Sequence, residues 1–381
     1  MSEPGVPTCE QDVADAVADA LRDGVKLAIG GGGSKAAIGS PVAVRALSMT
    51  GLRGVVDYDP AELVLTVRPG TPLAEVQALV AGSGQMLAFE PFDHGPIFGR
   101  DVGAATIGGV VAAGVSGSQR VSAGAARDHL LGFRAVSGRG EMFVAGARVV
   151  KNVTGFDLPK LAAGSWGRLF AMTELTLKVL PAPREARTLR LAGLPDEVAI
   201  RAMSRAMGSQ ADVAAAAHLP AGADSTTILR VQGFGPSVSA RCAMLEALLA
   251  DFGPLMTLPA DEADAMWESL RTLAPLGSER PVWRVNVAPG RACQAIAPLD
   301  GEAACLFDWA GGLIWIASDA GADRIRAAAS SAGGHAMLIR AGADMRAQVP
   351  AFHPQPDGIA RVEERVRRAF DPAGLFETGR F

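Results

Sequence analysis

Four consecutive glycines near the N-terminus constrain this chain more than any other feature. A short apolar run, Val25 to Ile29, predicts a buried strand, and Gly30-Gly31-Gly32-Gly33-Ser34-Lys35 follows it directly. Because glycine has no Cβ, this backbone can adopt positive φ and lie against a ligand, with successive N–H groups pointing into one concavity. The stretch therefore predicts a cradle for an anion such as a diphosphate, although a flexible turn would have the same composition.

Three kinds of nucleotide-binding loop compete for this stretch. A Walker A loop is excluded, because it needs Gly-Lys followed by Ser or Thr and the order here is Gly33-Ser34-Lys35. Residues 31–36 satisfy the loose dinucleotide pattern G-x-G-x-x-G/A, but that pattern requires a helix, and Gly39 and Pro41 stand where the helix would run. The third kind, a strand-and-loop cradle of a non-Rossmann flavoprotein, stays open.

The next segment predicts an antiparallel hairpin. Strands are expected over Leu52–Tyr58 and Leu63–Val67, and the short turn between them leaves no room for a crossover helix. A helix is predicted over Leu73–Ala81, with Thr71 as N-cap and Pro72 at the first helical position. An early hairpin further weakens the Rossmann interpretation.

Length and charge narrow the class of protein. The 381 residues suggest two domains, and 36 Lys and Arg against 40 Asp and Glu give a net charge of −4. No basic block stands out, so nucleic-acid binding has no electrostatic support. The polar N-terminus does not resemble a signal peptide, and no apolar segment is long enough to span a membrane, so we expect a cytoplasmic protein. The cysteines have no CxxC spacing, and we expect reduced thiols and no metal site.

Two further clusters of small residues follow. Gly103–Ser118 carries almost no large side chain, which predicts a backbone against which a large flat ligand lies; close packing of a helix is the alternative. A third cluster, Asn152–Leu161, leads through Gly164-Ser165-Trp166-Gly167 to a strand over Phe170–Pro181. Three such runs in one domain suit a long ligand better than a single phosphate.

The order of these motifs resembles the FAD-binding domain of the vanillyl-alcohol oxidase superfamily and, within it, the FAD-binding subunits of bacterial glycolate oxidases. The tail Phe370–Phe376 with Gly379-Arg380 also fits that family. The motifs that carry the resemblance are Ile29–Lys35, Val67–Gly70, Thr106–Gly109, Asp128–Gly132 and Thr154–Leu158.

The resemblance implies an α+β fold with a two-subdomain FAD-binding domain of the PCMH type. We expect this domain over residues 1–180, a second α+β cap domain over 181–345 and a C-terminal segment, 346–381, that returns to the FAD domain. The cap is expected from alternating elements: helices over Asp196–Met207, Ser237–Phe252 and Asp323–Ser331, and strands over Thr226–Gly233, Val282–Val287, Leu313–Ala317 and His335–Arg340.

The resemblance also implies which residues hold FAD. The expected cofactor-binding residues are Gly30, Gly31, Gly32, Gly33, Ser34, Lys35, Pro69, Gly70, Thr106, Gly108, Gly109, Ala113, Gly114, Ser116, Gly117, Gly155, Asp157, Gly164 and Gly167. Covalent members of the superfamily carry a His in the cradle loop, and this loop has neither His nor Cys. FAD is therefore expected to bind non-covalently.

Three residues are the candidates for chemistry on a substrate. Arg284 lies mid-strand between apolar residues, and its guanidinium could fork onto a carboxylate, although a solvent-facing Arg is the alternative. His335 and Arg340 have opposite parity on the last strand, so one at most lines a pocket. The family tail places Arg380 near the flavin. The Gly-Asp-Gly-Asn-x-His stretch of the catalytic glycolate oxidase subunit is absent, and the five histidines are dispersed.

Two functions follow from the resemblance. The first is an electron-transfer subunit of a glycolate oxidase or dehydrogenase, working with a catalytic flavoprotein subunit and an iron–sulfur subunit. Such a complex would be compatible with peripheral association with the inner face of the cell membrane. The second is a self-sufficient FAD-dependent dehydrogenase of a small 2-hydroxy acid. An assembly subunit without FAD is a third alternative, which the intact glycine runs oppose.

Overall fold

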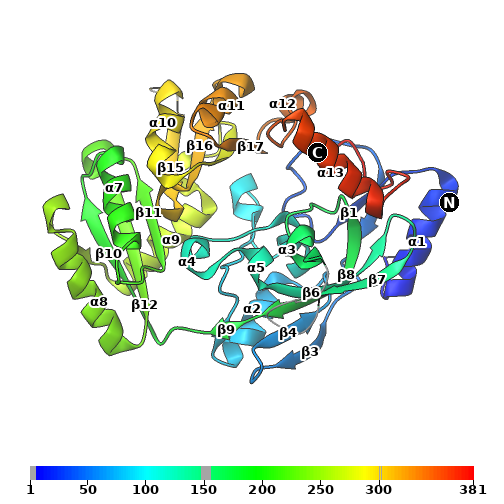
Figure 1. Ribbon diagram of the computed structural model, residues 1–381, viewed down its shortest axis with the longest axis horizontal. Helices are drawn as coiled ribbons and strands as arrows, with labels where there is room; N and C mark the ends of the chain where they lie inside the picture. The colour runs from blue at the N-terminus through cyan, green and yellow to red at the C-terminus, as the bar shows by residue number, and fades with distance from the viewer. Residues whose placement is uncertain (1–5, 147–155, 300, 302) are drawn as a thin grey trace.

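Two antiparallel sheets organise the computed structural model, which describes residues 6–146, 156–299, 301 and 303–381. The first sheet has the order β3-β4-β8-β6-β7, and the second β13-β10-β12-β11-β15-β16-β14-β17 (Figure 1). The first contains β3 (Val55–Asp59), β4 (Val64–Val67), β6 (Leu130–Ser137), β7 (Met142–Gly146) and β8 (Phe170–Lys178). The second contains β10 (Glu185–Ala192), β11 (Ala215–Leu219), β12 (Thr226–Gly233), β13 (Met256–Thr257), β14 (Val282–Asn286), β15 (Ala303–Asp308), β16 (Leu313–Ser318) and β17 (His335–Arg340).

The predicted hairpin is confirmed as the antiparallel pair β3–β4. The cradle strand β1 (Leu27–Gly30) lies outside the main sheets and pairs in parallel with β2 (Arg45–Ser48). Helix α1 (Glu10–Asp23) covers this pair, because its fully buried Val13, Val17 and Ala20 belong to one apolar cluster with Leu27 and Leu47. No helix follows the glycines, as the sequence predicted.

The predicted start of the next helix at Leu73 is confirmed, but the predicted cap is wrong by one residue. Helix α2 (Leu73–Gly82) has Pro72 as its N-cap residue, and no side chain caps it. The Thr71 hydroxyl instead donates to the Arg68 carbonyl at 2.7 Å and accepts the Gly54 N–H at 2.9 Å. Thr71 therefore closes the turn that precedes the helix, and the hydroxyl is no longer available as a cap.

Shorter elements complete the first half. They are β5 (Gln85–Met86), α3 (Ile107–Ala113), α4 (Arg120–Ala123), α5 (Ala126–His129), α6 (Leu158–Ala162) and β9 (Leu180–Pro181). The strand predicted over Phe170–Pro181 is interrupted, because β9 leaves the sheet of β8 and pairs with β5.

Most helices of this half cover one face of the second sheet, whereas α9 (Ala260–Thr272) and the first half pack on the other face (Figure 1). Trp283 and Val285 of β14 pack in the apolar cluster under the helices. Arg284 lies between them in sequence and therefore on the opposite face, opposite Trp315 of β16. The helices of this half are α7 (Asp196–Met207), α8 (Gly235–Leu248), α9 (Ala260–Thr272), α10 (Ala292–Ile296) and α11 (Ala322–Ser331).

The C-terminal segment returns to the cradle. Helix α12 (Ala343–Gln348) lies near β17, and α13 (Asp357–Phe370) runs beside the first half toward α1 and the N-terminus (Figure 1). The Leu27 N–H donates to the Leu375 carbonyl at 2.9 Å, and the Ser40 N–H donates to the Arg380 carbonyl at the same distance. The domain boundaries at residues 180 and 345 stay predictions.

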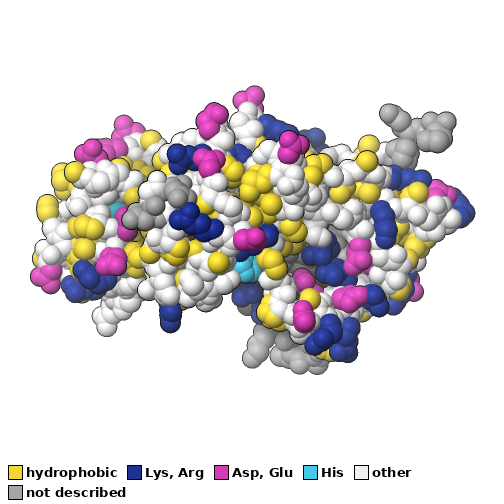
Figure 2. Space-filling model, turned by 90° about the horizontal axis from the view of Figure 1, so that it is seen from above, with side chains coloured by type: hydrophobic (Ala, Val, Ile, Leu, Met, Phe, Trp, Pro, Cys, Tyr) yellow, Lys and Arg dark blue, Asp and Glu magenta, His cyan; other side chains and the backbone are white. Residues whose placement is uncertain are grey.

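The visible surface mixes charges of both signs. Figure 2 shows Lys and Arg side chains interspersed with Asp, Glu and apolar ones, without an extended basic block on that face. Within the described residues, no helix is both long and apolar enough to cross a lipid bilayer.

Candidate functional site

The glycine loop forms the wall of a cavity, which we call the cradle cavity. Its volume is about 910 Å³ including the open mouth, within the range of sites that hold small molecules. Five separate chain segments and the C-terminus meet there. The lining residues are Ile29–Ala36, Met49, Pro69, Thr106, Gly108, Gly109, Ala112, Ala113, Trp166, Gly167, Phe170, Met172, Arg380 and Phe381.

The glycines of the loop are needed for different reasons. A Cβ on Gly32 would lie 1.9 Å from the Ala104 carbonyl oxygen, and one on Gly31 would lie 2.2 Å from Thr106 Oγ1. These two glycines let the loop pack on the segment before α3. A Cβ on Gly30 would meet no protein atom within 4 Å. Since Gly30 lines the cavity, a side chain there would occupy the space in which a ligand would lie.

Lys35 supplies a positive charge beside this loop. The side chain is buried, and its Nζ lies 3.2 Å from Ser34 Oγ. Desolvation by burial lowers the pKa of Lys35 to about 8, although Asp93 opposes the shift. A buried ammonium next to free backbone N–H groups is suited to the phosphates of a nucleotide.

A second cavity, the interface cavity, adjoins the first. The two share Ala113 and Trp166 in their walls, and the second has a volume of about 890 Å³ including its mouth. It lies between the two halves of the chain, since its walls come from α3, the loop at 92–94 and the face of the second sheet that is turned toward the first half. The lining residues are Ile38, Phe92, His94, Ala113–Ser116, Arg120, Ala125–Arg127, Ala163, Gly164, Trp166, Arg284, Trp315, Met337 and Ile339.

Arg284 enters the interface cavity from the centre of β14. It has no hydrogen bond or ion pair with any described residue, and its guanidinium carbon lies 5.1 Å from the ring centroid of Trp309. Part of its surface stays accessible because it faces the cavity. Protein still surrounds it closely enough that desolvation, with the nearby Arg120, lowers the pKa of Arg284 to about 10, although Asp308 opposes the shift. Of the described residues that line this cavity, none is acidic.

His94 lies in the same wall. It is 6% exposed and stacks on Phe92 with ring centroids 4.6 Å apart. Its Nδ1 has no hydrogen-bond partner of acceptable geometry among the described residues. Burial and the positive charges of Lys35 and Arg284 hold the pKa of His94 well below its usual value, and the Phe92 backbone opposes this only in part.

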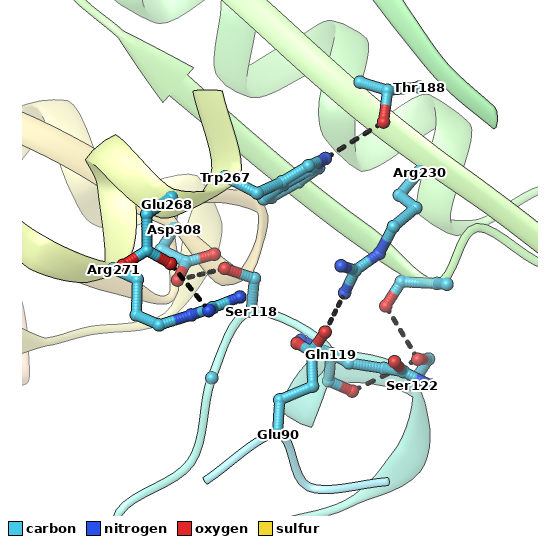
Figure 3. A network of polar contacts seen from close by, with 12 residues as sticks. Glu90, Ser118, Gln119, Ser122, Thr188, Arg230, Trp267, Glu268, Arg271 and Asp308 are labelled. Atoms are coloured by element: carbon cyan, nitrogen blue, oxygen red, sulfur yellow. Dashed lines mark hydrogen bonds and ion pairs between the residues drawn. The ribbon is translucent and has the colours of Figure 1, made fainter. Parts of the chain in front are cut away.

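A polar network joins the two halves next to the interface cavity (Figure 3). Ser118 Oγ donates to Asp308 Oδ2 at 2.8 Å, and Arg230 is paired with Glu90 at 2.5 Å. Trp309 Nε1 donates to the Gly117 carbonyl at 3.0 Å. Burial raises the pKa of Asp308 to about 7, although the hydrogen bonds from the Trp309 N–H and Ser118 oppose the shift. The network fixes the face of the second sheet over the first half.

Most of the expected cofactor-binding residues meet at the two cavities. Those at the cradle cavity are Gly30–Lys35, Pro69, Thr106, Gly108, Gly109, Ala113 and Gly167, and those at the interface cavity are Ala113, Gly114, Ser116 and Gly164. Gly70 lies outside both, packed on the Met49 carbonyl. Gly117 lies against Glu90, and Asp157 is exposed and paired with Lys160 at 2.9 Å. Gly155 lies outside the described residues.

The three candidates for chemistry lie in different places. Arg284 lines the interface cavity, whereas Arg380 lines the cradle cavity and donates to the carbonyls of Lys35 and Ile38 at 2.8 Å each. His335 is exposed at the start of β17 and lines neither cavity. Arg340, its alternative, donates to the Ile97 carbonyl at 2.9 Å.

Sequence reasoning missed His94, Arg120, Arg127 and Trp166. His94 stands in Pro91-Phe92-Asp93-His94-Gly95-Pro96, where a loop rich in Pro and Gly was the one available signal. The conformation of Trp166 also had no signal, since its φ is +57° in a residue other than glycine. It lies in the wall that the two cavities share. In the part of the chain that the structure describes, no group of three or more His, Cys, Asp or Glu could hold a metal ion.

Comparisons with known proteins agree with this geometry. Residues 6–146 match the model of a family described as an FAD binding domain. The chain is 35% identical over 377 residues to glycolate oxidase subunit GlcE of Escherichia coli (strain K12). The aligned region covers 97% of this chain and 96% of that protein. The chain is 26% identical over 210 residues to glycolate oxidase subunit GlcD of Bacillus subtilis (strain 168), covering 54% of this chain and 42% of that one.

A solved structure shows the same fold. The structure of p-cresol methylhydroxylase with substrate bound superposes with a TM-score of 0.71 at 14% identity, covering 98% of this chain and 87% of that chain. The expected α+β fold of the PCMH type is confirmed by this match and by the FAD binding domain.

Proposed function

The chain belongs to the glycolate oxidase subunit GlcE family of FAD-dependent oxidoreductases, and from this we propose that it is the FAD-binding subunit of a glycolate oxidase or dehydrogenase complex. In this role it takes part in the oxidation of glycolate or a related 2-hydroxy acid to the 2-oxo acid. The observation that carries the proposal is the pair of adjacent cavities, one lined by the glycine loop and the other by Arg284, which share Ala113 and Trp166 in their walls.

The residues of the cradle cavity fit FAD. Gly30 keeps open the space beside the loop, and the N–H groups of the loop with the Lys35 ammonium suit the two phosphates. Ala113 and Gly114 leave a wall without large side chains, on which a flat ring system could lie. When bound, FAD would supply the two-electron acceptor of the reaction. The chain's own residues bind it, orient it and exclude water.

We infer that FAD binds non-covalently. None of the residues that line the cradle cavity is His, Cys or Tyr, and covalent members of the superfamily carry a His in the cradle loop. The apolar Met49, Phe170 and Met172 line the same cavity and offer packing instead of a bond.

The partners are a catalytic flavoprotein subunit and an iron–sulfur subunit. The relative named GlcD supports the first, because its name gives it as a subunit of a glycolate oxidase. The described part of this chain has no cluster of cysteines that could hold iron and sulfur, so the second partner would carry those centres. We propose a cytoplasmic complex that associates with the inner face of the cell membrane through its partners.

One observation favours a second candidate, a dehydrogenase that oxidises a small 2-hydroxy acid on its own. An enclosed guanidinium without a counter-ion is costly, and such groups are retained where they bind an anion. Arg284 is in this position, in the wall of the cavity that adjoins the cradle cavity. A carboxylate held there would lie at the interface between the two halves of the chain.

Anaerobic reduction of the purified chain distinguishes the candidates. Flavin bleaching by glycolate or D-lactate without partners would establish independent catalysis. A yellow protein that is bleached only after the catalytic subunit is added would support the electron-transfer role. A colourless protein that does not take up added FAD would contradict both.

A further inference from the structure

His94 is an enclosed polar side chain to which the proposed function assigns no role. It is 6% exposed, and its Nδ1 is unpartnered among the described residues. Because Nδ1 is enclosed by protein atoms and the Phe92 backbone favours a proton on the imidazole, a ligand in the cavity would meet this ring at Nε2 and not at Nδ1. Its ring lines the same cavity as Arg284.

The charges around His94 determine which chemistry it can offer. Lys35 and Arg284 oppose a further positive charge on the imidazole, and Arg120 and Arg127 line the same cavity. The ring is therefore neutral and keeps one nitrogen as a hydrogen-bond acceptor. Arginine and lysine side chains have donors alone. The described residues contribute four charged or titratable side chains to the interface cavity: His94, Arg120, Arg127 and Arg284. Of these four, His94 alone can accept a hydrogen bond.

We infer that His94 recognises the hydroxyl group of the substrate by accepting a hydrogen bond from it, while Arg284 holds the carboxylate. The site then selects 2-hydroxy acids over simple carboxylic acids of the same size. The inference rests on the second candidate under the proposed function, which gives Arg284 the carboxylate, and it adds the group that distinguishes the alcohol. Phe92 stacks on the imidazole and so fixes the plane of the ring. With its acceptor held in this orientation, His94 acts as a specificity-determining residue.

The side chains next to His94 in sequence do not compete for this role. Both carboxylate oxygens of Asp93 are occupied by backbone N–H groups, from Gly95 at 2.8 Å to one oxygen and from Gly103 and Ala105 at 2.8 and 2.9 Å to the other. This loop therefore holds His94 in place, and the imidazole is the group it presents to the cavity.

Comparing the affinity for glycolate with the affinity for acetate tests the contact of His94 separately from that of Arg284, because the two anions differ by the hydroxyl group alone. Calorimetric titrations use the FAD-loaded chain after anaerobic photoreduction of its flavin, so that glycolate cannot be oxidised. We expect the wild-type chain to bind glycolate roughly tenfold more tightly than acetate. His94→Phe should abolish this preference and leave acetate binding unchanged. His94→Asn, which restores an acceptor, should regain part of it, whereas Arg284→Lys should weaken both anions.

The outcomes separate the inference from its premise. If the wild-type chain binds neither anion, the proposed carboxylate site is wrong. If it binds both but His94→Phe keeps the preference for glycolate, the role of His94 is wrong and that of Arg284 stands. Imidazole ¹⁵N NMR of the wild-type chain gives a test that needs no variant. One histidine signal should shift with glycolate and stay in place with acetate, and equal shifts with both anions would overturn the inference.

Discussion

The guanidinium of Arg284 lies 5.1 Å from the ring centroid of Trp309. The aromatic ring belongs to the turn that follows β15, and the strand of Arg284 is separated from β15 by β16, so the contact is made across the sheet. Arg120 of the first half lies over the same ring at 4.3 Å. Trp309 therefore stabilises two positive charges on the border of the interface cavity, where a cation–π contact partly replaces a counter-ion.

Arg284→Met should make the folded protein more stable and weaken its binding of glycolate. Removing an enclosed charge that has no ion-pair partner, and on which Asp308 acts only at longer range, should raise the free energy of unfolding by about 1 kcal/mol. The same change should weaken glycolate binding roughly 10-fold to 100-fold, because a charge-assisted contact to the carboxylate is lost. Thermal unfolding and calorimetry measure the two effects. Arg280→Met, at an exposed residue paired with Asp319, serves as the control and should change neither. A variant that is less stable and binds glycolate normally would contradict this assignment.

Lys35 should make FAD binding dependent on pH. The pKa of about 8 in the free protein means that the ammonium is charged below pH 8 and neutral above it. FAD phosphates favour the charged form, so affinity should fall as the pH rises above 8, by up to about tenfold per pH unit. Fluorescence titration of the apoprotein at pH 7 and pH 9.5 measures the change. Lys35→Arg should bind FAD with little dependence on pH over this range, since Arg keeps its charge. An equally steep fall in that variant would show that another group titrates.

The glycine loop should respond differently at two neighbouring positions. Gly32→Ala forces a Cβ against the Ala104 carbonyl and should lower the free energy of unfolding by about 1–3 kcal/mol. Gly30→Ala meets no protein atom and should leave the stability of the apoprotein unchanged. Its methyl group would enter the cradle cavity and should weaken FAD binding by roughly tenfold. Loss of stability in Gly30→Ala without loss of affinity would place the ligand elsewhere.

Asp308 should make the stability of the protein fall between pH 4 and pH 7. Its pKa is about 7 when folded against 3.8 for the unfolded carboxyl, so in this interval the folded state binds more protons than the unfolded state. The free energy of unfolding therefore decreases as the pH rises, and the full penalty is present above pH 7. Asp308→Asn should raise the free energy of unfolding at pH 8 by about 2 kcal/mol and leave it nearly unchanged at pH 4. Asp319→Asn, at an exposed carboxylate, is the control. An effect of equal size at both pH values would contradict the titration of Asp308.

Local patterns in the sequence predicted the elements but not the contacts between them. The hairpin β3–β4 and helix α7 were predictable, because turn residues and apolar periodicity act over a few residues. Strands β10, β11 and β15 were not predicted. The run Ala215–Leu219 has no alternation, since its first four residues are buried in the middle of the second sheet.

The same distinction holds for the candidate site, where local motifs were predictable and contacts between distant segments were not. The cradle was predictable because its glycines are consecutive in sequence and match a known order of motifs. The pair of His94 and Arg284 was not, because 190 positions separate the two residues and only the docking of the two halves brings them to one cavity. His335 was a plausible alternative on β17, and its exposure became visible only with the fold.

Flavin content of the purified chain tests the central claim most directly. The chain is purified without partners, saturated with FAD, desalted and then denatured in acid, and the flavin in the supernatant is measured per chain. We expect about one FAD per chain, all of it released, because the cradle cavity has room for one extended cofactor and no His or Cys in its wall. A chain that retains no flavin after desalting, or flavin that stays attached to the precipitated protein, would contradict the account.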